Sequence, residues 1–348
     1  MNQEQELFMT TQTLKIVDLA AVKLFSKISG YVKNQAGNFN FQNVLKSALV
    51  PGMAFMIFLV IWGGAASQVK TSLGTVPGPI KVWEQAMVLV DEHNEERDKE
   101  QRFNERQEKR NAKKLAADPD ATVRTRPYTG KATFFDQIWT SLITVATGFF
   151  IASLIAIPIG IICGLSPILY SALNPLIQIF KPVSPLAWLP IVTIIVSAAY
   201  VSQDPMFSKS YLTSAITVTL CCVWPTIINT TVGVSNISKD LLNVSQVLRL
   251  GWWTKIYKIV IPSSIPMMFA GLRVSLGIGW MVLIAAEMLA QNPGLGKFVW
   301  DEFQNGSSNS LARIMVAVFA IGFVGFMLDR LMLMLQKKVS WDKNAVLR

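Results

Sequence analysis

The chain has 348 residues, of which 51% are hydrophobic and 16% are charged, and its formal net charge is +10. Apolar content this high with charge this low is not typical of a soluble protein. The positive balance does not indicate nucleic-acid binding, because lysines and arginines that flank membrane spans and meet anionic lipid account for it.

Residues 1–47 are mixed, and the sequence leaves two structures open for them. Apolar residues at 14–25 are interleaved with lysines, which favours an amphipathic helix on the cytoplasmic membrane face; a loosely packed tail is the alternative. The start of the chain lacks a continuous apolar core and contains Glu4 and Glu6, which is not typical of a signal peptide. The first apolar run, 48–67, is therefore expected to stay as a transmembrane anchor.

The segment 68–136 follows this anchor and is dense in charge. A short helix is expected at 83–90. Residues 91–131 carry nearly balanced acidic and basic side chains, which predicts a solvated helix that ends near Asp118; a specialised partner-binding role is the less favoured alternative. The chain's only histidine, His93, cannot build a metal site alone, and we give it no role.

Uncharged stretches predict five further spans within a core of residues 137–336. A bilayer span needs about 20 apolar residues, so the uncharged run 137–180 is too long for one helix. The Ser166-Pro167 turn divides it, and Asn174-Pro175 is expected to open the next segment. All three cysteines fall inside spans, so no disulfide framework is expected. The sequence predicts an all-α, polytopic membrane protein with about six transmembrane helices: 48–67, 139–164, 175–201, 211–233, 267–289 and 313–335.

Six spans and a cytoplasmic N-terminus place the charged segment outside and residues 243–262 inside. The positive-inside rule alone would favour a cytoplasmic position for residues 97–114, but acidic residues nearly balance the basic ones there. Lysines before the first span and a basic tail at 337–348 favour a cytoplasmic location for both termini. We therefore expect both ends of the chain on the cytoplasmic side.

Residues 243–262 form a polar, basic segment centred on Gly251, and they separate two strongly apolar runs. The chain has no G-x-x-x-x-G-K-[ST] loop that would bind the phosphates of ATP. The run 294–297 ends in Gly-Lys but lacks the spacing of that motif, so it is not expected to bind phosphate. We predict that 243–262 is a docking surface for a separate, energy-supplying partner. An interfacial helix lying on lipid, which its tryptophans also suit, is the alternative.

This segment resembles the EAA loop in the permease subunits of bacterial ABC importers of the binding-protein-dependent type. Gly251 matches the glycine of that loop, and Ile261-Pro262 matches its end. The Glu-Ala-Ala positions are occupied by Ser245-Gln246-Val247, and the stretch after the glycine is shorter than in the family.

Segments on both sides of the loop resemble the nitrate, sulfonate and taurine permeases, and the last resembles the nitrate/bicarbonate/cyanate branch. The resemblance covers about 137–330, whereas residues 91–131 have no counterpart in it. In chain order, the similar segments are 185–190, 224–233, 271–273, 280–289 and 294–301.

The resemblance implies a type I (MetI-like) ABC importer permease fold in the bacterial inner membrane. It further implies a homodimer of this permease, two separate ATP-binding subunits and a periplasmic or lipoprotein substrate-binding protein, working by alternating access. The chain itself would be no enzyme and would hold no cofactor, since its partners bind ATP. Nitrate or nitrite is the first expectation for the substrate; bicarbonate, cyanate and sulfonate or taurine are the alternatives.

The coupling loop is expected to combine a bend, apolar side chains for grip and cations for orientation. Gly251 would permit a backbone bend where a Cβ would obstruct it, and Pro262 would set the start of the next span. The predicted coupling residues are Leu248, Arg249, Leu250, Gly251, Trp252, Trp253, Lys255 and Pro262.

The translocation path is expected to offer neutral hydrogen-bond donors and a diffuse positive field. Arg273 could attract an anion or extend to the cytoplasmic face, and the hydroxyl and amide groups could equally hold helices together. Glu287, near the outer end, could contact a binding protein or anchor its helix. The candidate path residues are Thr217, Asn229, Thr230, Arg273 and Trp280.

Two other classes of protein are less favoured. An ion-coupled secondary transporter would predict paired acidic residues or broken helices near mid-membrane, often in repeated halves. The sequence shows no repeat, and no buried carboxylate is expected beyond Glu287 near a boundary. A membrane-embedded enzyme would need a His/Glu cluster, a Ser/Lys dyad or metal-spaced ligands, and the spans lack these. No catalytic or metal-binding residue is predicted.

Overall fold

The computed structural model describes residues 41–71, 74–118, 122–123, 125–201, 206–307 and 309–339. The amphipathic helix expected at 14–25 and most of the expected tail at 337–348 lie outside the described residues. The chain divides into two units, Met1–Ala65 and Ala66–Arg348. The described part of the first unit is helix α2 (Phe41–Gln68), in which Leu49–Ala66 is long and apolar enough to cross a membrane. The predicted anchor coincides with this stretch.

The described residues of the second unit are mainly helical, with irregular connections and a two-residue antiparallel ladder between β1 (Lys70–Thr71) and β2 (Gly74–Thr75). Among the described residues, five helices are long and apolar enough to span a membrane, and a bent pair supplies up to a sixth. This confirms the predicted all-α fold with about six transmembrane helices. The helices are α3 (Pro79–Ala117), α4 (Phe134–Leu165), α5 (Pro167–Phe180), α6 (Pro185–Ala199), α7 (Lys209–Ser235), α8 (Lys239–Val247), α9 (Trp252–Lys255), a π-helical turn (Ile256–Val260), α10 (Ile261–Ala290), α11 (Leu295–Asn305) and α12 (Ser310–Val339).

The predicted span 175–201 is wrong as a single straight helix. α5 ends at Phe180, and α6 starts at Pro185 after a bend of 98°. Pro182 lies in the break, and Pro185 is the first residue of α6. Because proline has no N–H to donate and disfavours helical backbone in the residue before it, the helix stops here.

The start of this region also differs from the prediction. α5 opens at Pro167, in the first turn where proline is well tolerated, and not at Asn174-Pro175, which lies inside the helix. Ser166 caps α5 by accepting a hydrogen bond from the Leu169 N–H at 3.4 Å. The predicted division at Ser166-Pro167 is therefore confirmed as a helix boundary.

The charged segment after the anchor forms one 39-residue helix, α3. The short helix predicted at 83–90 and the charged helix after it are continuous, because no glycine or proline interrupts them. The helix ends at Ala117, and Asp118 is its C-terminal cap, as the sequence predicted. Only Val82 and Leu89 of α3 are buried, so most of its charge is solvated.

The segment that returns from α3 to α4 is hydrogen-bonded to α3. The Tyr128 hydroxyl donates to Glu96 at 2.7 Å and lowers the pKa of that carboxyl. The His93 ring lies 2.7 Å from the Thr133 hydroxyl. The histidine without an assigned role therefore contributes to holding α3 beside the start of α4.

Helices α4, α7 and α10 form the packed centre of the second unit. α4 carries a small residue at every fourth position: Gly148, Ala152, Ala156, Gly160 and Gly164. The three glycines approach α7 so closely that an added Cβ would meet its side chains and backbone carbonyls. Lipid gives little hydrophobic drive for helices to associate, so close packing through small residues holds them together.

Buried hydroxyl groups add hydrogen bonds between the same helices. Thr219 of α7 donates to the Gly148 carbonyl of α4 at 3.1 Å, and Ser275 of α10 donates to the Cys222 carbonyl of α7 at 2.7 Å. Bonds of this kind are worth about 0.5–2 kcal/mol in membranes. The Ser and Thr residues of these spans therefore contribute directly to helix packing.

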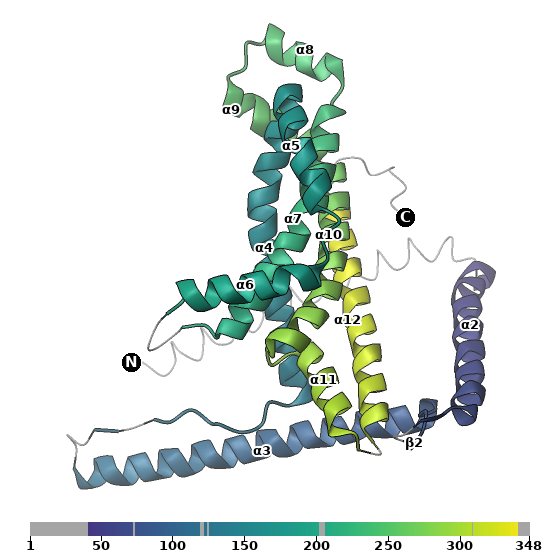
Figure 1. The fold of residues 1–348 in the computed structure, drawn as a ribbon, viewed down its shortest axis with the longest axis vertical. Helices are drawn as coiled ribbons and strands as arrows, with labels where there is room; N and C mark the ends of the chain where they lie inside the picture. Colours follow the sequence, from purple (N-terminus) through teal and green to yellow (C-terminus); the bar gives the residue numbers. More distant parts are fainter. Residues whose placement is uncertain are drawn as a thin grey trace, which may run out of the picture. The chain divides into compact units, whose positions relative to one another are not determined.

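The two ends of this bundle carry different elements (Figure 1). α8 and α9 lie at one end, which we call the patch end. α11 and α3 lie at the other, which we call the pocket end, and α3 crosses it (Figure 1). The 243–262 segment and the charged helix are therefore on opposite sides of the spans.

Candidate functional site

The predicted coupling segment contains a tight turn between α8 and α9. The Arg249 N–H donates to the Gln246 carbonyl and the Leu250 N–H donates to the Ser245 carbonyl, both at 3.0 Å. This pair of bonds is the Schellman arrangement, which ends a helix with one residue in the left-handed conformation. That residue is Arg249, whose φ is 46°.

The bend therefore lies at Arg249, and the expectation that Gly251 provides it is wrong. Gly251 has φ −59° and ψ 156°, which any residue can adopt. A Cβ added at Gly251 meets no atom within 4 Å. A requirement for glycine at this position would come from a partner that approaches the exposed backbone and not from the chain's own turn.

Two substitutions distinguish these roles. We expect Arg249→Gly to raise the Tm of the purified chain, since a left-handed residue with a Cβ costs roughly 1 kcal/mol. Gly251→Ala should leave Tm unchanged, because its methyl group points into open space. If Gly251→Ala lowered the Tm and Arg249→Gly left it unchanged, the strained backbone position of this turn would be Gly251 and not Arg249.

Large apolar side chains are exposed around this turn. Trp252 and Trp253 meet edge to face with ring centroids 4.6 Å apart, and Trp253 stacks against Tyr257 at 6.3 Å. Contiguous exposed apolar surface marks contact with a protein or a membrane. We call this surface the loop patch; its members are Val247, Leu248, Trp252, Trp253 and Tyr257.

Sequence reasoning named three of the five patch residues and missed Val247 and Tyr257. Tyr257 could have been found, because it follows Trp253 by four residues on a helix. Of the other predicted coupling residues, Arg249 and Gly251 are exposed, and Leu250 and Lys255 are half-buried. Pro262 was expected to set the start of the next span; it is the second residue of α10 but lies inside the continuous helical stretch Trp252–Ala290, which begins ten residues earlier.

The loop patch is joined to a long transmembrane helix. α9, the π-helical turn and α10 follow one another without a break and form the helical stretch Trp252–Ala290. Val260 in the π-helical turn is buried and packs with Ile161 of α4 and Val234 of α7. At 1.5 Å per residue the stretch is roughly 55–60 Å long. The loop patch and the far end of α10 therefore belong to one continuous helical stretch.

The polar residues predicted for the path lie in the contacts of α7. Thr217 and Thr230 are fully buried, and Thr230 packs against Gly160 of α4. Asn229 is half-buried and donates from Nδ2 to the Pro225 carbonyl at 2.9 Å. These residues are spread along one helix and contribute to its packing.

The two predicted path residues on α10 both interact with α12. Trp280 donates from Nε1 to the Ile321 carbonyl at 3.0 Å. Arg273 forms a bidentate ion pair with Asp329, with one N–O distance of 2.9 Å. The sequence left two roles open for Arg273, attraction of an anion or extension to the cytoplasmic face. It did not predict the ion pair with Asp329, which lies 56 residues away.

A double-mutant comparison separates pairing from substrate attraction. We expect Arg273→Leu to lower the amount of folded protein more than the double change Arg273→Leu with Asp329→Leu. The single change leaves one charge unpaired in the membrane, whereas the double change leaves none. The measurement is the yield and Tm of the purified variants, with transport measured in parallel. If the double variant folds well but transports no better than the single one, Arg273 acts on the substrate.

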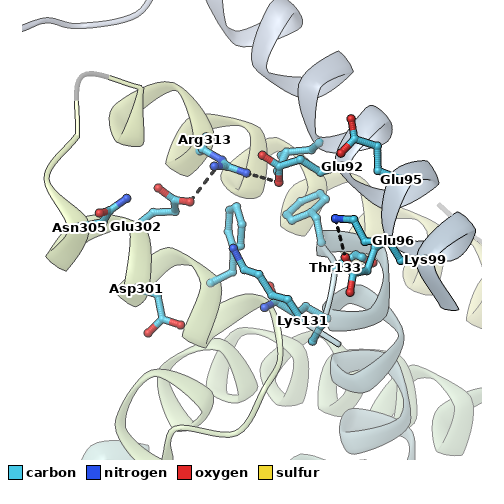
Figure 2. Close-up of a pocket in the computed structure, with 15 residues that line it drawn as sticks. Glu92, Glu95, Glu96, Lys99, Lys131, Thr133, Asp301, Glu302, Asn305 and Arg313 are labelled. Atoms are coloured by element: carbon cyan, nitrogen blue, oxygen red, sulfur yellow. Dashed lines mark hydrogen bonds and ion pairs between the residues drawn. The ribbon is translucent and has the colours of Figure 1, made fainter. Parts of the chain in front are cut away.

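A charged pocket of about 390 Å³ lies at the pocket end, between α3, α4, α11 and α12. Figure 2 shows Arg313 of α12 between Glu92 of α3 and Glu302 of α11. Glu92 and Arg313 are 221 residues apart, so no local pattern could have shown this bridge. The charged residues that line the pocket are Glu92, Glu95, Glu96, Lys99, Lys131, Asp301, Glu302 and Arg313.

Glu287, for which sequence reasoning left two roles open, is fully buried at the end of α10. It accepts hydrogen bonds from Ser141 of α4 and from the backbone of Gly296. The carboxylate therefore anchors its own helix to its neighbours.

The fold defines a polytopic membrane protein in which a polar segment with exposed aromatic side chains lies between two spans. The chain belongs to the family described as "binding-protein-dependent transport system inner membrane component", whose profile matches residues 156–341. The resemblance found in the sequence is confirmed by this match.

Relatives with described functions support the same family. The nitrate import permease protein NrtB of Synechococcus elongatus is 39% identical over 204 residues, which are 59% of this chain and 69% of the relative. The bicarbonate transport system permease protein CmpB of Synechocystis sp. is 40% identical over 207 residues, 59% of this chain and 69% of the relative. The taurine transport system permease protein TauC of Escherichia coli is 27% identical over 209 residues, 60% of this chain and 71% of the relative.

A solved structure has the same fold. The inward-facing MetNI methionine ABC transporter contains a chain that matches with a TM-score of 0.51 and 12% identity. The match covers 60% of this chain and 96% of that one. The predicted type I ABC importer permease fold is thereby confirmed.

Proposed function

We propose that this chain is the membrane-spanning subunit of an ATP-driven importer for a small inorganic anion, with nitrate or nitrite as the first candidate. The observation that carries the proposal is the similarity to the nitrate import permeases, which extends over more than half of the chain. ATP hydrolysis belongs to separate subunits, since the chain contains no nucleotide-binding loop.

The two ends of the bundle receive different partners. The patch end faces the cytoplasm, where the loop patch docks in a cleft of each ATP-binding subunit. The pocket end faces outward and receives a substrate-binding protein, so that residues 68–136 lie outside and 137–336 form the core in the inner membrane. Two copies around a twofold axis enclose the path. Both termini lie in the cytoplasm.

The transport cycle is alternating access. Closure of the ATP-binding pair draws the two loop patches together and opens the path outward, and hydrolysis returns it inward. The candidate path residues Asn229 and Arg273 are half-buried, whereas Thr217, Thr230 and Trp280 are buried in helix contacts. If the latter three meet the substrate, α7 and α10 must separate from their neighbours during the cycle.

Bicarbonate is the second candidate substrate, because the similarity to the bicarbonate permeases is as high as that to the nitrate permeases. Both anions are planar oxyanions with a single negative charge. Neutral hydrogen-bond donors in a diffuse positive field serve either one.

Reconstitution tests the proposal. The chain is placed in proteoliposomes with the ATP-binding subunits and the substrate-binding protein encoded beside it, and uptake of isotopically labelled nitrate and bicarbonate is measured. We expect ATP-dependent uptake of nitrate that needs all components. Preferential uptake of bicarbonate would select the second candidate. Accumulation driven by an ion gradient in vesicles that hold this chain alone would overturn the proposal.

A further inference from the structure

The first turn of α11 is capped by side chains from two other helices. An α-helix leaves its first N–H groups without partners inside the helix, and Gly294, which precedes α11, has no side chain to accept from them. The Leu295 N–H donates to Ser141 Oγ of α4 at 2.9 Å. The Gly296 N–H donates to Glu287 Oε2 of α10 at 3.0 Å. α4 and α10 thus supply the acceptors that a local N-cap residue usually provides.

Several donors and one helix end converge on the buried Glu287 carboxylate. Ser141 Oγ lies 2.9 and 2.8 Å from its two oxygens and donates to them. Asn292 Nδ2 donates to it at 3.5 Å and also to Thr144 of α4 at 3.3 Å. Burial of a carboxylate is unfavourable unless hydrogen bonds compensate it. These donors and the positive end of the α11 dipole do so only while α11 keeps its present position.

Two glycines leave the space that the carboxylate fills. A Cβ at Gly294 would collide with the Glu287 carboxylate, and a Cβ at Gly296 would collide with the Ile284 carbonyl oxygen. Neither glycine has the positive φ that favours glycine for conformational reasons. Both glycines are therefore needed because α11 approaches α10 closely. The Glu287 carboxylate fills the space that side chains at these two positions would occupy.

The orientation of α11 sets one wall of the charged pocket. Glu302 of α11 lies 3.2 Å from Arg313, which also pairs with Glu92 of α3 (Figure 2). Phe298 of α11 packs against Phe134 of α4 with ring centroids 4.9 Å apart. A rotation of α11 away from Glu287 would move the wall of the pocket and its link to α3.

We propose that Glu287 is the positioning residue of the pocket end: it holds α11, and through α11 the pocket surface that the substrate-binding protein contacts. This inference rests on the proposed function, which places the pocket end outside. Because Trp252–Ala290 is one helical stretch, the same helix carries the loop patch at one end and Glu287 near the other. Displacement of the patch is thereby passed to the surface that contacts the binding protein.

The test uses Glu287→Gln in the full complex, reconstituted in nanodiscs. The amide keeps the size of the side chain but replaces one acceptor oxygen by an NH2 donor, so that the Gly296 N–H and Asn292 Nδ2 can no longer each have an oxygen to donate to. We expect faster hydrogen exchange of the backbone amides in 291–305. The binding-protein concentration that gives half-maximal ATPase stimulation should rise about tenfold, as loss of a hydrogen bond to a charged group implies. The rate at saturating binding protein should stay within about twofold.

Ser141→Ala serves as the second variant, because it removes one hydroxyl group and is expected to shift the same two measurements in the same direction. Glu108→Gln, an exposed change on α3, is the matched control and should alter neither. Unchanged exchange in 291–305 for both Glu287→Gln and Ser141→Ala would overturn the proposal. So would an equal loss of ATPase rate at every concentration of binding protein, which would show a structural role alone. The exchange measurement needs no transported anion, so failure of the proposed function is seen separately, as absent uptake by the unaltered complex.

Discussion

Trp253→Ala is expected to weaken binding of the ATP-binding subunits more than tenfold and to lower ATP-dependent uptake. The Trp253 side chain is 65% exposed and lies between Trp252 and Tyr257 in the loop patch. An exposed tryptophan at the centre of a docking surface is the residue type that most often contributes 2 kcal/mol or more to binding. A loss of about 2 kcal/mol weakens association more than tenfold. The measurement is the amount of ATP-binding subunit that co-purifies with the tagged chain.

Trp83→Ala is the matched control for this prediction. Trp83 is also 65% exposed, but it lies on α3 at the pocket end of the bundle. Its replacement should leave co-purification unchanged. If Trp253→Ala also retained its ATP-binding subunits and its ATP-dependent uptake, the loop patch would not be the docking surface and the proposed coupling would fail.

The arrangement of spans could be predicted because it follows from apolar length and from proline. The run 137–180 exceeds one bilayer crossing, and the helix boundary at Ser166-Pro167 is local in sequence. The bend between α5 and α6 was missed, although Lys181 and Pro182 lie in it and Pro185 follows it, because the apolar residues on its two sides together have the length of one bilayer crossing. Hydropathy reports that a segment avoids water and does not report whether it is straight.

The coupling segment shows where sequence reasoning reaches its limit. Its position and its tryptophans could be read from composition and spacing. The turn could not, since left-handed backbone is expected at glycine and the structure places it at Arg249. The partners of Glu287 were equally hidden, because Ser141 lies 146 residues away. A buried carboxylate is recognised from its donors, and these come together only in the folded chain.

α10 connects the loop patch to the pocket end of the bundle. One of its faces packs against α7 through glycines and hydroxyl groups, and its two ends are tied to different surfaces. In the proposed cycle, force from the ATP-binding subunits reaches the pocket end along this helix, through the π-helical turn and past Pro262 and Pro266.

Gly160→Ala is expected to destabilise the bundle by about 1–3 kcal/mol, the usual result of overpacking a tight contact. The added Cβ would lie 2.6 Å from Thr230 Cβ and 3.0 Å from the Ile227 carbonyl oxygen of α7. Thr230 is fully buried and the carbonyl belongs to the helix backbone, so neither can move aside, and α4 and α7 must separate.

Gly277→Ala on α10 and Gly322→Ala on α12 are the matched controls, because a Cβ at either position meets no atom within 4 Å. Each replaces glycine by alanine in a transmembrane helix, a change that favours helix formation by up to about 1 kcal/mol. Their Tm should equal or exceed that of the unaltered chain, while the Tm of Gly160→Ala falls. The comparison is made by thermal unfolding of the purified chain in one detergent. If Gly160→Ala were as stable as these two variants, the small residues of α4 would not carry the packing against α7, and hydrogen bonds such as that from Thr219 to the Gly148 carbonyl would have to hold the helices together.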